Sequence, residues 1–420
     1  MLQYSDICNQ DMNSEKLFHP LPGATKEAWL QQVNKDLKGA DFNSKLVSIN
    51  EGIEIQPLYT REDLPDFVKD ISTEFLEDFE EEIVSAVEQQ GADILVWNIC
   101  EETNGDAAFL NDLVIASLKR GANCLRIHCS DWDLFFSDIR KINYQHTFIL
   151  NVDSDLTEEN MVNIWRERIG FIGNRDLLIS AIEFDPIGHF IKNKNIEHGE
   201  KSFNNLSQLF FRLSPHLHDC RLIKVDTTVF ENAPPAEQLA YALSMASEYL
   251  DQMDRREVPL EELIHLFTFR FSIGTDYFFE IAKLRAFKIL WTNLLKAFIE
   301  DIEFIPNPHI HAVTSLQQTD TISRHTNLIR STTEAMSAIL GGCDDLSILP
   351  YDENDPNAVR LATHIQNILR YESNFDHYRE AANGSFYIEK ITSELAEQAW
   401  NLFQEIEDGG GILEKVRREK

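Results

Sequence analysis

Strand-like and helical segments alternate eight times between residues 94 and 371, and this alternation limits the folds open to the chain. The clearest unit is FTFRFSIGTDYFFEIAKLRAFKILW, residues 267–291. Phenylalanine or isoleucine stands at every odd position from 267 to 273 with polar residues between, the period of a strand with two different faces. Gly274 ends the strand, and Thr275 or Asp276 can cap the helix that follows. A strand that leads directly into a helix is half of a βα unit.

The same pattern recurs along the chain. Further strands are predicted at residues 94–100, 124–129, 147–152, 177–184, 221–227, 309–315 and 346–349. Helices are predicted at residues 107–120, 158–170, 203–213, 236–253, 277–299, 327–340 and 357–371. Eight strands, each followed by a helical pattern, predict an α/β fold of the closed (β/α)8 barrel type. The alternative is an open doubly wound sheet, but no glycine-rich phosphate fingerprint follows an early strand.

The segments that flank the barrel predict an N-terminal arm and a trailing C-terminal helix. Before the barrel we expect an irregular arm (1–25), a helix (26–37), a hairpin of strands 46–50 and 53–58 that turns at Glu51-Gly52, and an acidic helix (64–88). After it, Thr392 is predicted to cap a helix that runs to about residue 407, before a loosely held tail. The predicted parts are therefore an arm with helix and hairpin (1–60), the barrel (61–380) and the C-terminal helix and tail (381–420).

Composition excludes several classes of partner. The formal net charge is −32, which repels nucleic acid and anionic membranes. No apolar run reaches the length of a membrane span, and the N-terminus lacks the pattern of a secretory signal. The six cysteines show no CxxC spacing, which favours a reduced, cytoplasmic protein.

Strand periodicity also predicts which side chains enter the barrel. If the apolar face of strand 267–273 meets the helices, Arg270 points inward. The same parity places charged or imidazole side chains of four other strands inside: Arg126 and His128, Glu183, Lys224 or Asp226, and His309 and His311. Because an isolated buried charge is costly, these groups must be paired. They would form either a polar active-site cavity or a barrel closed by ion pairs, and the sequence leaves both open.

Two smaller clusters offer little chemistry. His309 and His311 could ligate a metal, but no third ligand is spaced to join them, so no metal site is predicted. Cys129, Ser130 and Asp131 beside His128 suggest a nucleophile and base, yet nothing around them resembles a nucleophile elbow.

Residues 273–291, IGTDYFFEIAKLRAFKILW, resemble the corresponding helix of the methylmalonyl-CoA mutase family. Residues 310–353 are also similar, with a family-like pattern at Arg330, Thr332, Thr333, Glu334, Ala335, Met336, Gly341 and Gly342. So is the tail, at Arg360, Ala362, Gln366, Leu369, Glu372, Ser373, 384–389, Leu395, Ala396, Ala399 and Trp400. AWLQQVNKDLKGADF and EGIEIQPLYT near the N-terminus resemble the opening of the family's small subunits.

The resemblance implies an isomerase of propionate metabolism, which interconverts methylmalonyl-CoA and succinyl-CoA by radical chemistry on the cobalt cofactor adenosylcobalamin. Catalytic chains of the family thread coenzyme A through a (β/α)8 barrel and carry a cobalamin domain. This sequence departs from them in three places. It contains no cobalamin-domain ligand motif (Asp-x-His-x-x-Gly). Residues 226–235, DTTVFENAPP, lack the family's Tyr-His pair, and an acidic segment replaces the substrate-holding segment after residue 60.

These departures predict a small, non-catalytic subunit that supports a catalytic large subunit as a heterodimer. Adenosylcobalamin is expected on the partner, and no catalytic, cofactor-binding or metal residue is expected on this chain. The alternative is a stand-alone barrel enzyme or an acyl-CoA-binding protein with a polar site around Arg126, His128 and Arg270. Aromatic candidates for the partner surface are Phe375, Tyr378, Phe386 and Tyr387.

Overall fold

The structure is a computed structural model of the whole chain. It describes residues 25–64, 97–104, 107–128, 146–151, 177–193, 199–213, 220–299, 304–315, 323–377 and 381–418. The chain divides into two compact units, Met1–Thr60 and Arg61–Lys420.

The first unit contains two helices and a hairpin: α1 (Lys26–Asp36), α2 (Phe42–Leu46), β1 (Ser48–Asn50) and β2 (Ile53–Ile55). The Thr25 hydroxyl accepts a hydrogen bond from the Ala28 backbone N–H and caps α1. The two strands pair antiparallel through Glu51 and Gly52, which both have positive φ angles (49° and 75°). Two such residues form the turn that suits the twist of a two-residue hairpin, so the predicted hairpin is confirmed.

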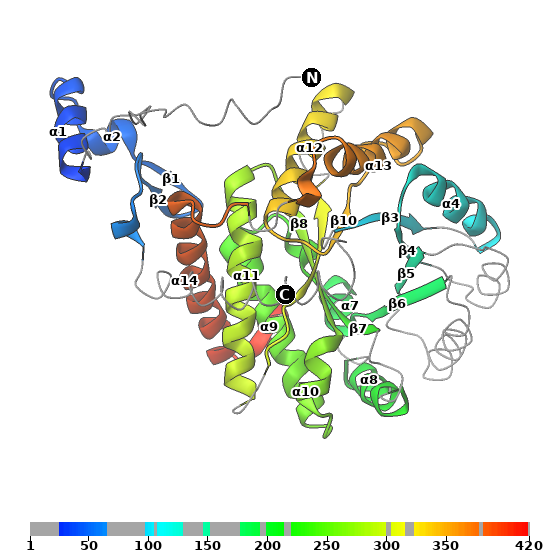
Figure 1. Cartoon of the computed structure of the whole chain (residues 1–420). Coiled ribbons are helices and arrows are strands. Elements are labelled where there is room, and N and C mark those ends of the chain that lie inside the picture. Colours follow the sequence, from blue (N-terminus) through cyan, green and yellow to red (C-terminus); the bar gives the residue numbers. More distant parts are fainter. Residues whose placement is uncertain are drawn as a thin grey trace, which may run out of the picture. The chain divides into compact units, whose positions relative to one another are not determined.

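The second unit is a closed barrel of eight parallel strands, in the order β10-β3-β4-β5-β6-β7-β8-β9 (Figure 1). The strands are β3 (Asn98–Asn104), β4 (Cys124–His128), β5 (His146–Asn151), β6 (Leu177–Phe184), β7 (Arg221–Asp226), β8 (Phe267–Ile273), β9 (His309–Thr314) and β10 (Asp345–Ser347). Each consecutive pair from β3 to β10 is adjacent, and β10 also pairs with β3. The predicted (β/α)8 barrel is confirmed, and the open sheet is excluded.

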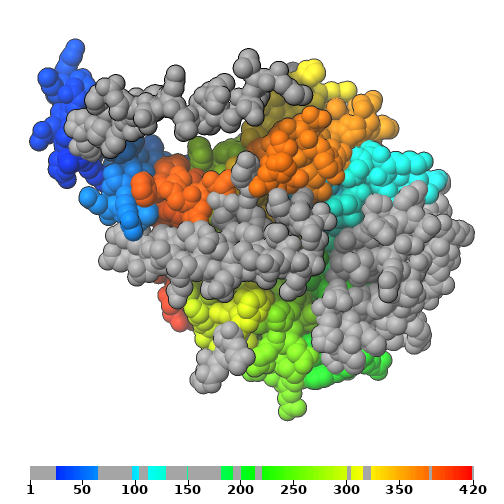
Figure 2. Space-filling model, viewed as in Figure 1, coloured from blue at the N-terminus to red at the C-terminus, as the bar shows by residue number. Residues whose placement is uncertain are grey.

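Helices follow the strands around the outside of the barrel (Figure 1). They are α4 (Ala107–Arg120), α7 (Pro186–Asn193), α8 (Gly199–Leu213), α9 (Pro235–Asp254), α10 (Leu260–Leu263), α11 (Tyr277–Phe298), α12 (Arg324–Leu340), α13 (Pro356–Tyr371), α14 (Phe386–Asp408) and α15 (Gly411–Arg418). Short 3-10 turns are η1 (Arg61–Asp63), η4 (Thr227–Phe230), η5 (Ile264–Leu266) and η6 (Phe375–His377). The first and last helices of the ring, α4 and α13, contact each other, and Figure 2 shows their surfaces side by side.

The core between barrel and helices is built from aromatic side chains of β8 and α11. Phe269 packs on Phe287 and Trp291 at ring-centroid distances of 4.6 and 4.9 Å, and Phe271 packs on Phe287 at 4.8 Å. These side chains are fully buried. The apolar face of β8 therefore meets the helices, as its alternation predicts, and Arg270 points to the opposite side.

Three boundary predictions are wrong, and two predicted helices are untested. Thr392 is not a cap, because α14 already begins at Phe386 and Thr392 is buried within it. The tail is not loose over residues 411–418, where α15 buries Ile412 and Val416. The first barrel strand ends at residue 104 rather than 100. Predicted helices 64–88 and 158–170 lie outside the described residues.

Candidate functional site

The barrel axis is occupied by the guanidinium group of Arg126 from β4. Its Nη1 donates to both carboxylate oxygens of Glu183 on β6, at 2.8 and 2.7 Å, and its Nη2 donates to Asp345 on β10 at 2.9 Å. In this eight-stranded barrel β6 and β10 are four strands apart, which is the greatest possible separation. One side chain that bonds to both walls must therefore cross the middle. The three residues are at most 2% exposed.

A second arginine makes a similar crossing. Arg270 on β8 donates to both carboxylate oxygens of Glu102 on β3, at 2.9 and 2.8 Å, and to Asp226 on β7 at 3.2 Å. Strands β3 and β7 are again four apart. His311 of β9 lies beside this group, with its Nε2 2.9 Å from the Ser347 hydroxyl and 3.6 Å from Glu102.

Mutual neutralisation keeps these groups ionised despite burial. Burial by itself would lower the pKa of Arg126, but Glu183 and Asp345 raise it well above its ordinary value. Burial would likewise raise the pKa of Asp345, yet His309 and Arg126 hold it well below the usual range. Burial and the two nearby arginines lower the pKa of His311 well below its ordinary value, so this imidazole is neutral. The group is a set of fixed charges rather than a proton-transfer site.

The predicted interior residues are mostly confirmed, and two of the most important were missed. Glu183 and Asp226 are in the network, and His309 Nε2 lies 2.9 Å from Asp345. The missed partners are Glu102 and Asp345. The predicted strands stopped at residue 100 and began at residue 346, but the barrel needs both residues for the ladder with β4 and β9. If the predicted strands 94–100 and 346–349 had been extended by one or two residues, the same alternation of side chains would have placed Glu102 and Asp345 inside the barrel.

His128 does not join the other two residues of the alternative site. It is exposed at the last position of β4. Within the described part of the chain, no hydrogen bond or ion pair links it to Arg126 or Arg270. Cys129, Ser130, Asp131 and Tyr378 lie outside the described residues. The sequence predicted one site from Arg126, His128 and Arg270. The structure places the two arginines in the barrel interior and His128 outside their network.

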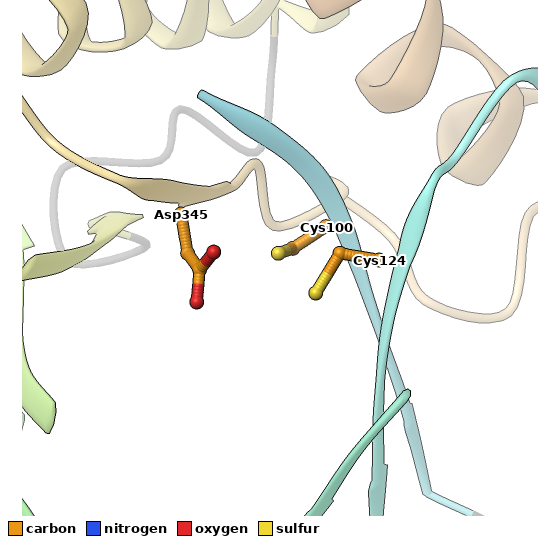
Figure 3. Close-up of side chains that lie close together, drawn as sticks. All are labelled: Cys100, Cys124 and Asp345. Atoms are coloured by element: carbon orange, nitrogen blue, oxygen red, sulfur yellow. The ribbon is translucent and has the colours of Figure 1, made fainter. Parts of the chain in front are cut away.

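Two thiols and a carboxylate meet inside the barrel near Arg126. Cys100, Cys124 and Asp345 are buried, and their ligand atoms lie within 4.8 Å of one another. Figure 3 shows the two sulfur atoms on adjacent strands, facing the carboxylate. Burial and the neighbouring Cys124 raise the pKa of the Cys100 thiol. The Asp345 carboxylate already accepts from Asn98, Arg126 and His309. A thiol with a raised pKa and a carboxylate that already accepts three hydrogen bonds are poor metal ligands, so this arrangement is a packed core.

The carboxyl end of the barrel contains a small polar cavity. It has a volume of about 70 Å³ and lies where β8 and β9 end, between Ser272, Ser315, Glu231, Glu280 and Glu334. Barrel enzymes place their active sites at this end, but ligand pockets have volumes of about 300–1,000 Å³. The cavity is too small for an acyl-CoA. The larger groove of about 600 Å³ lies on the outside, between α7, α8, α9 and α15, away from the barrel axis.

Another buried carboxyl lies at the same end of the barrel, after β6. Asp185 accepts hydrogen bonds from the Gly188 backbone N–H and the Tyr249 hydroxyl, both at 2.8 Å. Burial raises its pKa from 3.8 to about 6. A Cβ atom at Gly188 would lie 2.1 Å from the Asp185 carboxylate, so only glycine allows this contact.

Comparison with known proteins fits both the barrel and the sequence motifs. The family model for methylmalonyl-CoA mutase matches residues 159–419, more than half of the chain. The chain belongs to the methylmalonyl-CoA mutase family. It is 28% identical over 415 residues to the methylmalonyl-CoA mutase small subunit of Porphyromonas gingivalis, which covers 95% of this chain and 65% of that protein. The Propionibacterium freudenreichii small subunit is 24% identical, over 95% of this chain and 64% of that protein.

A second kind of mutase relative is matched over a shorter stretch. The methylmalonyl-CoA mutase of Rhizobium meliloti is 30% identical over 254 residues, 58% of this chain and 35% of that protein. The chain thus spans slightly less than two thirds of the length of the small-subunit relatives in this mutase family. Among the described residues, no helix has the length and apolar character needed to cross a bilayer.

The barrel of this mutase-family member does not fit the family's ligands. A coenzyme A tail along the axis would meet the Arg126 and Arg270 pairs, and breaking a buried ion pair is costly. The 70 Å³ cavity cannot hold the adenosyl group of the cofactor within its walls. The described residues therefore offer neither group a place inside the barrel.

Proposed function

We propose that this chain is a non-catalytic small subunit of an adenosylcobalamin-dependent methylmalonyl-CoA mutase. In this proposal a catalytic large subunit binds the cofactor, which supplies the radical, and converts methylmalonyl-CoA to succinyl-CoA. The present chain supports that subunit through its barrel. The small-subunit relatives favour the subunit role, and the crossing of the axis by Arg126 is the observation that carries the non-catalytic role.

The segment after β7 supports the same proposal. Where the family has its Tyr-His pair, this chain folds the turn η4 (Thr227–Phe230). Asp226 caps that turn through the Thr228 N–H, and the Thr227 hydroxyl donates to the Arg270 backbone carbonyl at 2.7 Å. These side chains hold the turn on the barrel, and neither threonine can act as a general acid at neutral pH.

The proposal also includes the cellular compartment and the division of the chain into parts. A reduced, cytoplasmic compartment is part of the proposal, because the six cysteines of the sequence show no CxxC spacing. The division of the chain into an arm (1–60), a barrel scaffold (61–380) and a C-terminal part (381–420) is retained as part of the proposal.

The test is to express the chain alone and together with a candidate large subunit. We expect stable co-purification, and conversion of methylmalonyl-CoA only by the complex in the presence of adenosylcobalamin. Equilibrium dialysis should detect adenosylcobalamin on the large subunit and the complex but not on this chain alone. Turnover or cofactor binding by the isolated chain would contradict the proposal.

A pair of variants separates this role from a stand-alone site. His128→Ala removes the accessible member of the alternative site, and His325→Ala removes an exposed imidazole from α12 as a matched control. We expect both complexes to keep the activity of the unmodified complex. A selective loss with His128→Ala would favour chemistry on this chain.

A further inference from the structure

The cavity at the ends of β8 and β9 has a wall of polar side chains, most of which carry oxygen atoms. Three carboxylates come from different elements: Glu231 from the end of η4, Glu280 from α11 and Glu334 from α12. The hydroxyls of Ser272 and Ser315 complete this wall, and each donates to Glu231 at 3.3 Å. Carboxylate and hydroxyl oxygens without sulfur or imidazole are the donor set of small, hard cations.

Glu334 is the member of this wall whose carboxylate is least satisfied. Its side chain is 1% exposed, and within the described residues neither carboxylate oxygen makes a hydrogen bond of good geometry. Burial and Glu280 outweigh the favourable effects of Arg330 and the Ser315 backbone N–H, and raise the pKa of Glu334 to about 8. A buried carboxylate is normally hydrogen-bonded, ion-paired or bound to a metal. An orphan carboxylate on a cavity wall therefore indicates a missing partner inside the cavity.

The charges around the cavity do not balance. Lys283 is fully buried and pairs with Glu280 at 2.6 Å. Its ammonium group also donates to the Ser272 carbonyl at 2.7 Å and to Gln238 at 3.1 Å, which fixes it on one side. Lys283 neutralises Glu280, but burial and Glu280 outweigh the charge of Arg330 and raise the pKa of Glu334 to about 8. The ionised form of Glu334 is therefore not fully compensated where it faces about 70 Å³ of space. A water molecule occupies about 30 Å³, so there is room for an ion and one or two waters.

From this geometry we infer that the cavity binds one divalent, oxygen-preferring cation of the Mg²⁺, Ca²⁺ and Mn²⁺ class, with Glu334 as its anchoring ligand. Water molecules complete the coordination, because the three carboxylates do not all lie within 4.8 Å of one another. The bound ion would hold together the elements after β7, β8 and β9. This site is independent of the proposed subunit role, since it requires no partner and no turnover.

Binding can be measured on the full chain with Mn²⁺ as the probe. The protein is first treated with EDTA and dialysed, and free Mn²⁺ is then followed by electron paramagnetic resonance during titration at pH 8.5. We expect one saturable site per chain that Mg²⁺ or Ca²⁺ displaces, and Glu334→Gln should weaken it at least tenfold. Glu397→Gln, on the exposed face of α14, removes the same charge from the surface and should leave the site unchanged.

Two outcomes would overturn the inference. One is the absence of a saturable Mn²⁺ site in the unmodified chain, which would mean that a proton alone neutralises Glu334. The other is equal weakening by Glu334→Gln and Glu397→Gln, which would indicate diffuse attraction to the acidic surface. Circular dichroism in EDTA checks that both variants fold. If Glu334→Gln does not fold, Ser315→Ala is the second variant, and unchanged Mn²⁺ affinity in it would also count against the site.

Discussion

The charges on the barrel axis and the charges at the ends of β8 and β9 are equally buried but differently satisfied. Arg126 is 2% exposed and bonds to two carboxylates on opposite walls. Glu334 is 1% exposed and has no hydrogen bond within the described residues. On the axis both arginines contact carboxylates, although the Nε atoms of Arg126 and Arg270 make no hydrogen bond within the described residues. In one barrel, buried charges in contact with opposite charges are typical of a scaffold, and a buried carboxylate without such a contact indicates a site.

The largest effect is expected from Arg126→Met. This change leaves Glu183 and Asp345 buried without their cation, and breaking such a pair costs about 3–5 kcal/mol. Urea denaturation should show this loss in the free energy of unfolding. Adding Glu183→Gln and Asp345→Asn should recover part of it, because the uncompensated charges are then gone. A loss below about 1 kcal/mol would mean that the axis is less tightly paired than its distances indicate.

A smaller loss is expected from Arg270→Met. Its side chain is 18% exposed and its partner Glu102 is 24% exposed, so water can partly solvate Glu102 when the arginine is removed. Its other partner, Asp226, is buried but keeps Lys192 and Lys224 at 3.9 and 4.0 Å. We expect a loss of about 2–3 kcal/mol in the same urea experiment. If Arg270→Met lowers the free energy of unfolding as much as Arg126→Met or more, then the destabilisation depends on position along the barrel axis rather than on the degree of burial.

Asp185 is buried and accepts hydrogen bonds from the Gly188 backbone N–H and the Tyr249 hydroxyl. Its folded pKa is about 6 against an ordinary value of 3.8, so the folded protein holds this proton more tightly than the unfolded chain. That contribution to stability is complete below pH 3.8 and is lost as pH rises to about 6. Relative to Asp185→Asn, the unmodified chain should lose on the order of 2 kcal/mol between pH 4 and pH 7.

The measurement for Asp185 is the difference in unfolding free energy between the two proteins at each pH. This difference cancels the titration of the other carboxylates, whose pKa values are lowered on the axis. A difference that stays constant from pH 4 to pH 7 would contradict the raised pKa.

The smallest effect is expected from Glu334→Gln in EDTA. With no cation present at pH 7, burial keeps the Glu334 carboxyl protonated, because its pKa is raised to about 8, and the amide of glutamine is a neutral group of the same shape. The free energy of unfolding should therefore change by less than about 1 kcal/mol. Thermal denaturation in EDTA and in Mn²⁺ provides the check, with a difference between the variants only in Mn²⁺. A large loss of unfolding free energy in EDTA would mean that Glu334, like Arg126, stabilises the fold without a bound cation.

Local patterns in the sequence were enough to predict most of the fold. The alternation at 267–273 predicted β8, its outward aromatic face and the inward direction of Arg270, because side-chain direction in a strand depends only on position parity. Glu51-Gly52 predicted the hairpin for an equally local reason, since few residues tolerate that turn. The helix start at Phe386 was misplaced although Ser385 stands at its N-cap, where the serine hydroxyl makes no capping hydrogen bond. The burial of Thr392 within the helix is a tertiary effect that the local sequence does not reveal.

The candidate sites depended on contacts that no local pattern contains. Arg126 meets Glu183 across 57 positions and Asp345 across 219, and Arg270 meets Glu102 across 168. The sequence alone determined that charged side chains enter the barrel. Only closure of the eight strands decided that they neutralise one another across the axis. Pairing over such separations is set by which strands end up opposite each other, and that is a property of the closed sheet rather than of any segment.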